Sequence, residues 1–256
     1  MEGREREGRI GLWILGICGF FLISLFVAPL TMASGTVPAL SGRANALDYM
    51  TKNGKFSWGN QQASDDAKVG HDQESRDLFA WTDLNWYAAF IYGFGDLNCH
   101  QRTERSWTIN GNQMPMCVRD IGIFAGGMLA GALWRKRGLN RWTIRDSLFS
   151  LMPDSSLEGF YADNRRTLLL MVFAGMTLLP IGLDGGLQAI TEYESTALRR
   201  MVTGLIFGFG FLAFFAASLS ARPSFFESPA QVVLPAGASF VRAEDQDAVH
   251  QASSEE

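Results

Sequence analysis

The sequence predicts an all-α integral membrane protein with about four transmembrane helices, an exported N-terminal loop and an interfacial aromatic helix. Three observations predict this class. Of the 256 residues, 47% are hydrophobic, these residues are concentrated in uncharged runs, and Lys and Arg gather beside those runs. About 20 helical residues cross a hydrocarbon core of about 30 Å. The small formal net charge of −4 does not indicate a nucleic-acid partner.

Four apolar runs predict the spans. The first, residues 10–32, has no charged residue and is longer than the apolar core of a typical signal peptide, which favours a membrane anchor over a cleaved signal. The second, residues 121–134, is short and reaches spanning length only with the residues that lead in from Met114. The third and fourth runs are residues 167–190 and 201–219. Each of these runs is therefore expected to form a membrane helix.

Basic residues beside the runs predict the orientation, because Lys and Arg near spans are retained on the cytoplasmic side. They cluster before the first run, after the second and before the third: Arg4, Arg6, Arg9, Arg135, Lys136, Arg137, Arg141, Arg145, Arg165 and Arg166. The three clusters share one side when both termini are cytoplasmic. A multi-pass protein of the cell membrane is therefore predicted, with residues 33–119 and the connection 191–200 extracytoplasmic.

The chain divides into four predicted segments. Residues 1–32 are the N-terminal membrane anchor, and residues 33–77, rich in Gly, Ser, Asn and Asp, are an exported polar loop. Residues 78–220 are the membrane domain, which opens with an aromatic helix at 78–95. That helix is expected at the membrane interface, with a soluble core helix and a fifth crossing as alternatives. Residues 221–256 are predicted to be a disordered acidic tail.

The predicted topology brings polar side chains from four segments to one level on the outer side. They are Cys99, His100, Gln101, Arg105, Cys117, Arg119, Asp120, Asp184, Gln188, Ser195 and Arg199. A carboxylate costs at least about 2.5–3.5 kcal/mol at the membrane centre and usually faces a partner inside the bundle. Asp184 is therefore expected to pair with Arg199. The alternative is that Asp184 only ends its helix at a wet interface.

Cys99 and Cys117 have two interpretations. A disulfide outside the cell would stabilise the loop between them by about 3 kcal/mol. A metal site is the other, with zinc as the candidate ion, Cys99, Cys117 and Asp120 as ligands, and His100 or Asp184 completing the shell. Cys117 and Asp120 are one helical turn apart, so their side chains share a face.

These residues resemble a family of predicted membrane proteins of archaea and bacteria, domain of unknown function 2085. The resemblance covers about residues 93–215. Its first block matches at Cys99, His100, Gln101, Arg105, Ser106, Trp107, Asn110, Gly111, Pro115, Cys117, Arg119, Gly122 and Ile123. Its second block matches at Asp184, Gly185, Gln188, Ser195, Arg199, Thr203 and Gly204. The resemblance implies a membrane protein and supplies no established reaction.

The chain departs from the family pattern at one position of this motif. The family has a second cysteine three residues after Cys117, and this chain has Asp120 there. A carboxylate cannot form a disulfide but can bind a metal. The departure therefore disfavours a dithiol mechanism through that pair and leaves a metal or polar-network role open.

The sequence favours a metal-assisted enzyme acting on an anionic lipid or lipid-linked substrate at the outer membrane interface. The metal would activate a water, and arginines would hold the anionic headgroup. Candidate catalytic residues are Asp184, Arg105 and Arg199, and candidate substrate-binding residues are Gln101, Arg119, Gln188 and Ser195. A disulfide-braced structural or assembly protein and a transporter component are the alternatives, and arginines near a membrane also pair with ordinary lipid phosphate.

Overall fold

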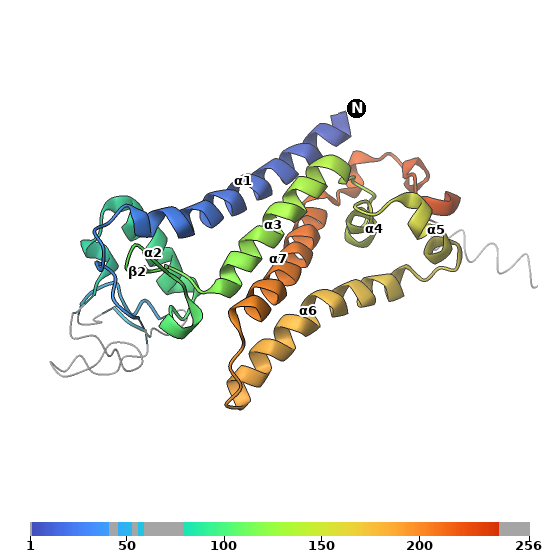
Figure 1. Ribbon diagram of the computed structural model, residues 1–256. Coiled ribbons are helices and arrows are strands. Elements are labelled where there is room, and N and C mark those ends of the chain that lie inside the picture. The colour runs from blue at the N-terminus through green and yellow to red at the C-terminus, as the bar shows by residue number, and fades with distance from the viewer. Residues whose placement is uncertain (1, 41–45, 53–55, 59–78, 241–256) are drawn as a thin grey trace, which may run out of the picture. The chain divides into compact units, whose positions relative to one another are not determined.

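The computed structural model describes residues 2–40, 46–52, 56–58 and 79–240, and this part of the chain is mostly helical (Figure 1). Its α-helices are α1 (Glu2–Leu30), α2 (Trp86–Asn98), α3 (Val118–Arg137), α4 (Ile144–Phe149), α5 (Asp154–Ala162), α6 (Arg166–Ile190) and α7 (Ala197–Ser220). Two short strands, β1 (Thr108–Ile109) and β2 (Asn112–Gln113), pair antiparallel. The predicted helical class is confirmed.

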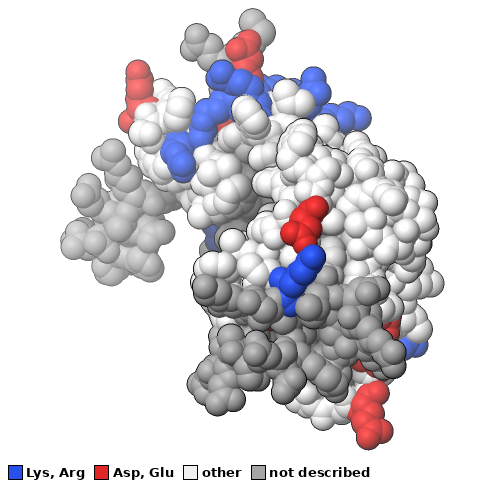
Figure 2. Space-filling model, turned by 90° about the vertical axis from the view of Figure 1, so that its left-hand side faces the viewer, with Lys and Arg blue, Asp and Glu red and all other residues white. Residues whose placement is uncertain are grey.

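Three of the described helices are long and apolar enough to cross a membrane: α1 from Arg4 onward, α6 and α7. They coincide with the first, third and fourth predicted spans. Large apolar side chains on them are exposed, among them Trp13, Met176 and Leu198, as expected for helices in contact with lipid. On the face shown in Figure 2 most of the surface is likewise uncharged.

The second predicted span, residues 121–134, coincides with α3, which is not among those three helices. Charged residues occupy both of its ends, with Arg119 and Asp120 in the first turn and Arg135, Lys136 and Arg137 in the last. They leave a shorter apolar stretch between them than α6 or α7 has. The count of about four spans therefore stays a prediction.

Glycines bring α3 against α7 with their backbones in contact. A Cβ atom added at Gly122 would lie 2.2 Å from the Met201 carbonyl oxygen, and one at Gly204 would lie 2.2 Å from the Arg119 carbonyl oxygen. Side chains larger than hydrogen do not fit at such distances. Small residues allow this close approach between membrane helices, and it fixes how the start of α7 faces the first turn of α3.

The chain forms two compact units. The first unit comprises residues 1–15, 129–177 and 210–256, and the second comprises residues 16–128 and 178–209. Helices α1, α3, α6 and α7 each contribute a segment to both units.

The core of the second unit is an apolar cluster that joins the latter half of α1 to α2 and to the residues around the hairpin. Its buried members are Leu25, Ala28, Val37, Leu40, Tyr49, Phe79, Ala88, Ile91, Tyr92, Cys99, Met114, Met116 and Ile121. The hairpin turns at Asn110 and Gly111, which both have positive φ (51° and 71°), as a two-residue hairpin turn of this type requires. Cys99, the first candidate ligand, is thus part of a packed core.

A buried carboxylate ties the segment before α2 to that helix. Asp96 accepts hydrogen bonds from the backbone N–H groups of Asp48 (3.0 Å) and Tyr49 (2.9 Å) and from Trp81 Nε1 (3.0 Å). Burial raises the pKa of Asp96 to about 6. Part of the predicted exported loop is therefore held against α2, and residues 41–45, 53–55 and 59–78 lie outside the described residues.

The first unit is organised around a second buried carboxylate, Asp146 of α4. It accepts a hydrogen bond from the Tyr161 hydroxyl of α5 (2.7 Å). Beyond α7, in the segment where a disordered tail is predicted, three short 3-10 turns lie at Pro223–Phe225, Pro229–Gln231 and Pro235–Gly237, and Val232 and Leu234 are buried. Residues 241–256 lie outside the described residues.

Candidate functional site

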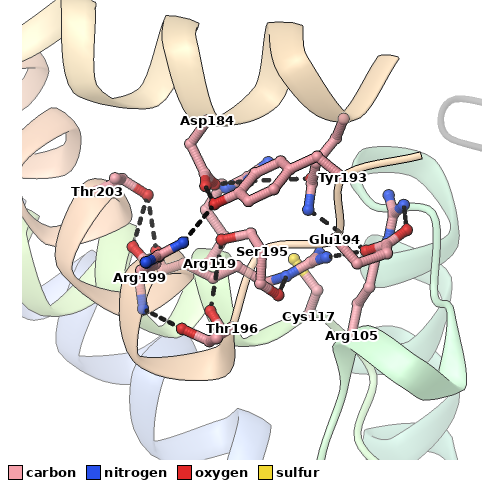
Figure 3. A network of polar contacts seen from close by, with 12 residues as sticks. Arg105, Cys117, Arg119, Asp184, Tyr193, Glu194, Ser195, Thr196, Arg199 and Thr203 are labelled. Carbon is pink, nitrogen blue, oxygen red and sulfur yellow. Dashed lines mark hydrogen bonds and ion pairs between the residues drawn. The ribbon is translucent and has the colours of Figure 1, made fainter. Parts of the chain in front are cut away.

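A cavity of about 320 Å³ lies in the second unit. The side chains that line it come from the loop after α2, the first turn of α3, the end of α6 and the start of α7: Cys99, His100, Arg102, Arg105, Cys117, Arg119, Gly185, Gln188, Ala189 and Arg200. Two thiols and four guanidinium groups therefore face one space, and Figure 3 shows the polar contacts around it.

Three candidate metal ligands lie together at this cavity. One ligand atom each of Cys99, Cys117 and Asp120 lies within 4.8 Å of the other two. Cys117 Sγ donates a hydrogen bond to Asp120 Oδ2 (3.0 Å), and the Cys117 N–H donates to Cys99 Sγ (3.3 Å). The cysteines of the described residues are free thiols in the structure. Two sulfurs and a carboxylate at this separation suit tetrahedral zinc, with a fourth position left for water or substrate.

The surroundings of Cys99 keep its thiol protonated. The hydrogen bond with Cys117, burial and the charge of Asp120 raise the pKa of the Cys99 thiol well above its ordinary value. Nucleophilic cysteines need a lowered pKa. Cys99 is therefore not suited to attack a substrate as a thiolate.

The other two predicted ligands lie apart from this cluster. His100 is exposed and lines the cavity, but it is not in the group of close ligand atoms, and neither is Asp184. The residues that the structure brings together as ligands are therefore Cys99, Cys117 and Asp120.

Asp184 of α6 forms an ion pair with Arg119 of α3, whose Nη2 donates to Asp184 Oδ2. The Tyr193 hydroxyl donates to Asp184 Oδ1 (3.1 Å), and Arg199 Nη1 donates to the same hydroxyl (3.2 Å) (Figure 3). The prediction that Arg199 is the direct partner of Asp184 is wrong, because the first turn of α3 places Arg119 nearer. Arg199 is linked to Asp184 by hydrogen bonds through the Tyr193 hydroxyl, and the charges of Arg199 and Asp184 also attract each other.

Glu194 links two of the arginines that line the cavity. Arg105 Nη2 donates to Glu194 Oε1 (2.8 Å), and Arg200 Nη2 donates to Glu194 Oε2 (2.6 Å). Burial by itself would raise the pKa of Glu194, but the hydrogen bond and charge of Arg105 and the charges of Arg200 and Arg102 hold it below its ordinary value. Glu194 is therefore ionised at neutral pH and orients both guanidinium groups.

Sequence reasoning missed Tyr193 and Glu194. Both lie in the connection between α6 and α7, "TEYEST" at residues 191–196. The feature of the sequence that could have identified them is a tyrosine next to an acidic residue in a short connection just before Arg199 and Arg200.

The predicted substrate-binding residues divide into two groups. Arg119 and Gln188 line the cavity, and with the Gln188 side-chain amide turned over, its Oε1 accepts hydrogen bonds from Arg200 Nη2 and the Ser195 N–H, both at 2.7 Å. Gln101 is buried, and its Nε2 donates to the carbonyl oxygens of Tyr92 (3.2 Å) and Pro115 (2.9 Å). Gln101 therefore holds the backbone that positions the cavity. Ser195 is buried and is likewise not among the lining residues.

Positive charge dominates the lining of the cavity. Arg102, Arg105, Arg119 and Arg200 face it, while the paired carboxylates Asp184 and Glu194 are not among the lining residues. Guanidinium groups bind phosphate and carboxylate oxygens with paired, charge-assisted hydrogen bonds. The cavity is therefore suited to an anionic group placed beside the two thiols.

Comparison with known proteins gives a match to a family model over part of the chain and no reaction. Residues 99–214 match the model of a family described as a predicted membrane protein, domain of unknown function 2085. An uncharacterized protein of Methanocaldococcus jannaschii is 30% identical over 122 residues, which are 46% of this chain and 62% of that protein. No solved structure matches the chain. The apolar helices and the motif from Cys99 onward agree with this match to a family of predicted membrane proteins over residues 99–214.

Proposed function

We propose that this membrane protein is a metal-assisted enzyme that acts on an anionic lipid or a lipid-linked substrate at the extracytoplasmic side of the membrane. One observation carries the proposal: Cys99 and Cys117, two of three clustered metal ligands, line the same cavity as four arginines. A metal ion and an anionic substrate would therefore bind next to each other in this cavity. Both termini would be cytoplasmic, and residues 33–119 would be extracytoplasmic.

The metal would be zinc held by Cys99, Cys117 and Asp120. A metal with three protein ligands keeps a fourth position for water and lowers the pKa of that water. Hydrolysis of an ester or phosphoester is the reaction class that such a site serves. The oxygen of the water bonds to the phosphorus or carbonyl carbon, the bond to the leaving oxygen breaks, and a proton of the water passes to that oxygen.

The arginines would bind the substrate. Arg105 and Arg200, fixed by Glu194, would hold the anionic group, and Arg119 would be held toward it by Asp184. Asp184 is thus a positioning residue, because its two oxygens already accept from Arg119 and Tyr193. Arg199 orients Tyr193 and belongs to the same network.

The place of the cavity supports a lipid-linked substrate. Gly185, Gln188 and Ala189 lie in the last turns of α6, and Arg200 lies in the first turn of α7. These are the ends of two helices that are long and apolar enough to cross a membrane. A headgroup at the bilayer surface would reach the cavity while its acyl or prenyl chain stays in the bilayer.

Elemental mass spectrometry of the full-length protein, purified in detergent without chelators, tests the metal. We expect about one zinc per chain, from three protein ligands and one site. The double variant Cys99→Ala, Cys117→Ala should lose it, and the matched control Cys18→Ala, a buried cysteine of α1 outside the cavity, should keep it. Metal-free wild-type protein with an intact helical circular dichroism spectrum would refute the metal site.

A disulfide-braced structural or assembly protein is the second candidate, favoured by the 3.3 Å contact between the Cys117 N–H and Cys99 Sγ. Alkylation of the denatured protein with and without prior reduction, read by peptide mass spectrometry, separates the two. Free thiols at both positions in protein isolated under oxidising conditions support the metal site, and a quantitative Cys99–Cys117 bridge supports the structural role.

A further inference from the structure

A second cavity lies in the first unit, separate from the proposed active site. Its volume is about 270 Å³, and it is lined by Arg4, Lys136, Arg137, Leu139, Arg141, Ser150, Met152, Pro153 and Asp154. These residues come from the start of α1, the end of α3, the turn that leads into α4, the connection between α4 and α5, and the start of α5. Four cations and one carboxylate therefore surround one space.

Arg141 is the anchor of this cavity. Its side chain is 6% exposed, and its Nη2 donates to both oxygens of Asp154 (2.7 and 3.0 Å). Its Nε and Nη1 are buried and have no hydrogen-bond partner among the described residues. Burying a cation is costly unless it is fully paired and hydrogen-bonded. Asp154 is partly exposed and contacts only Nη2 of Arg141. A second negatively charged group bound beside Arg141 would therefore be stabilised.

The backbone around Arg141 is fixed by the side chains of α4 and the turn after it. The Arg141 N–H donates to Ser147 Oγ (2.9 Å), and the Leu139 N–H donates to Ser150 Oγ (2.9 Å). Ser150 Oγ in turn donates to the Ser147 carbonyl oxygen (2.6 Å). An arginine that only reaches for the membrane surface needs no such support. The hydrogen bonds indicate a preformed site.

The cations from the helix ends are held beside it. Arg137 Nη1 donates to the Leu151 carbonyl oxygen (3.1 Å), and Arg4 Nη2 donates to the Lys136 carbonyl oxygen (2.5 Å). Basic residues in the last turn of α3 also complement the helix dipole, but Arg4 and Arg141 lie outside α3 and still line the same cavity. Figure 2 shows Lys and Arg gathered at the top of the view, the end at which Figure 1 marks the N-terminus.

We propose that this cavity is a binding site for a phosphate group, supplied either by the headgroup of an anionic phospholipid or by a soluble phosphate. Arg141 and Arg137 provide planar donors that match phosphate oxygens, and Lys136 and Arg4 add charge. On the predicted topology the site faces the cytoplasm, where basic pockets at membrane depth bind anionic headgroups. The inference does not depend on the metal site, because no residue is shared between the two cavities.

Native mass spectrometry of the full-length protein in detergent tests the site with phosphatidylglycerol as the anionic probe and phosphatidylcholine as the zwitterionic one. We expect Arg141→Gln to weaken retention of phosphatidylglycerol about tenfold, the effect of losing one charge-assisted contact. Lys136→Gln, an exposed position, should weaken it in the same direction without affecting folding. Arg165→Gln, an exposed arginine that does not line the cavity, is the matched charge control and should bind as the wild type does.

Inorganic phosphate identifies the source of the phosphate group. Displacement of phosphatidylglycerol by millimolar phosphate, with the same loss in Arg141→Gln, supports a site that also takes soluble phosphate, whereas retention against phosphate supports a lipid site. Equal retention by wild type, Arg141→Gln and Lys136→Gln would overturn the proposal, as would an equal loss in Arg165→Gln, which indicates unspecific attraction. If Arg141→Gln does not fold, Lys136→Gln against Arg165→Gln decides.

Discussion

Arg119 of α3 and Asp184 of α6 form the ion pair that connects two helices far apart in sequence at the wall of the candidate site. Their side chains are 19% and 7% exposed, so each charge depends on the other. In a partly buried place, removal of one partner leaves a charge that water does not compensate.

Asp184→Asn should therefore destabilise the protein by about 3 kcal/mol, because it leaves Arg119 buried without a carboxylate. Thermal unfolding in detergent measures the loss. The double variant Asp184→Asn, Arg119→Gln should recover part of it, since it removes the stranded charge, and additivity of the two single changes would contradict the pairing. Tyr193→Phe, which removes only the hydroxyl that donates to Asp184, should cost about 1 kcal/mol.

If Asp120 is a zinc ligand, the zinc content of the protein should depend on which residue replaces it. Asp120→Cys restores the residue type that the family pattern has there, so it should retain zinc with a third thiolate ligand. Asp120→Ala should lose most of the metal, because it removes one of three clustered ligands. Zinc content after dialysis, compared with wild-type protein, checks both. Full zinc content in Asp120→Ala would show that the carboxylate is not a ligand.

The contact between α3 and α7 predicts that an added methyl group is harmful at one glycine and harmless at another. Gly122→Ala places a Cβ 2.2 Å from the Met201 carbonyl oxygen, so the helices must separate, at a cost of about 1–3 kcal/mol. Gly186→Ala, in α6, meets nothing within 4 Å and should be neutral or slightly stabilising. Thermal unfolding of the two variants in detergent makes the comparison. Equal stability of both would argue against the backbone contact.

The buried Asp96 predicts that the second unit loses stability as the pH rises. Burial raises the pKa of Asp96 from 3.8 to about 6, so between these values the folded protein binds the proton that the unfolded chain releases. The contribution of Asp96 to stability is then fully present below pH 3.8 and is lost as the pH rises through 6. Unfolding measured across this range should show the slope.

Asp96→Asn removes the titrating group and should flatten that part of the pH profile. The variant should also be less stable at low pH, because an amide cannot accept from all three donors, the Asp48 and Tyr49 N–H groups and Trp81 Nε1. An unchanged slope in Asp96→Asn would assign the pH dependence to another group.

The sequence by itself determined the features that depend on local pattern. Apolar runs of spanning length predicted α1, α6 and α7, since burying a helix in lipid depends on the length and composition of one segment. The one-turn spacing of Cys117 and Asp120 predicted that they share a face, and both lie in the ligand cluster.

Only the tertiary structure decided which polar groups meet. The partner of Asp184 is Arg119 rather than Arg199, Gln101 supports the backbone inside the core, and Glu194 orients two arginines. Such pairings depend on the depth and rotation of each helix, which are set by contacts such as that of Gly122 with Met201. A local pattern of residues contains no measure of depth or rotation, because both result from packing between segments far apart in the chain.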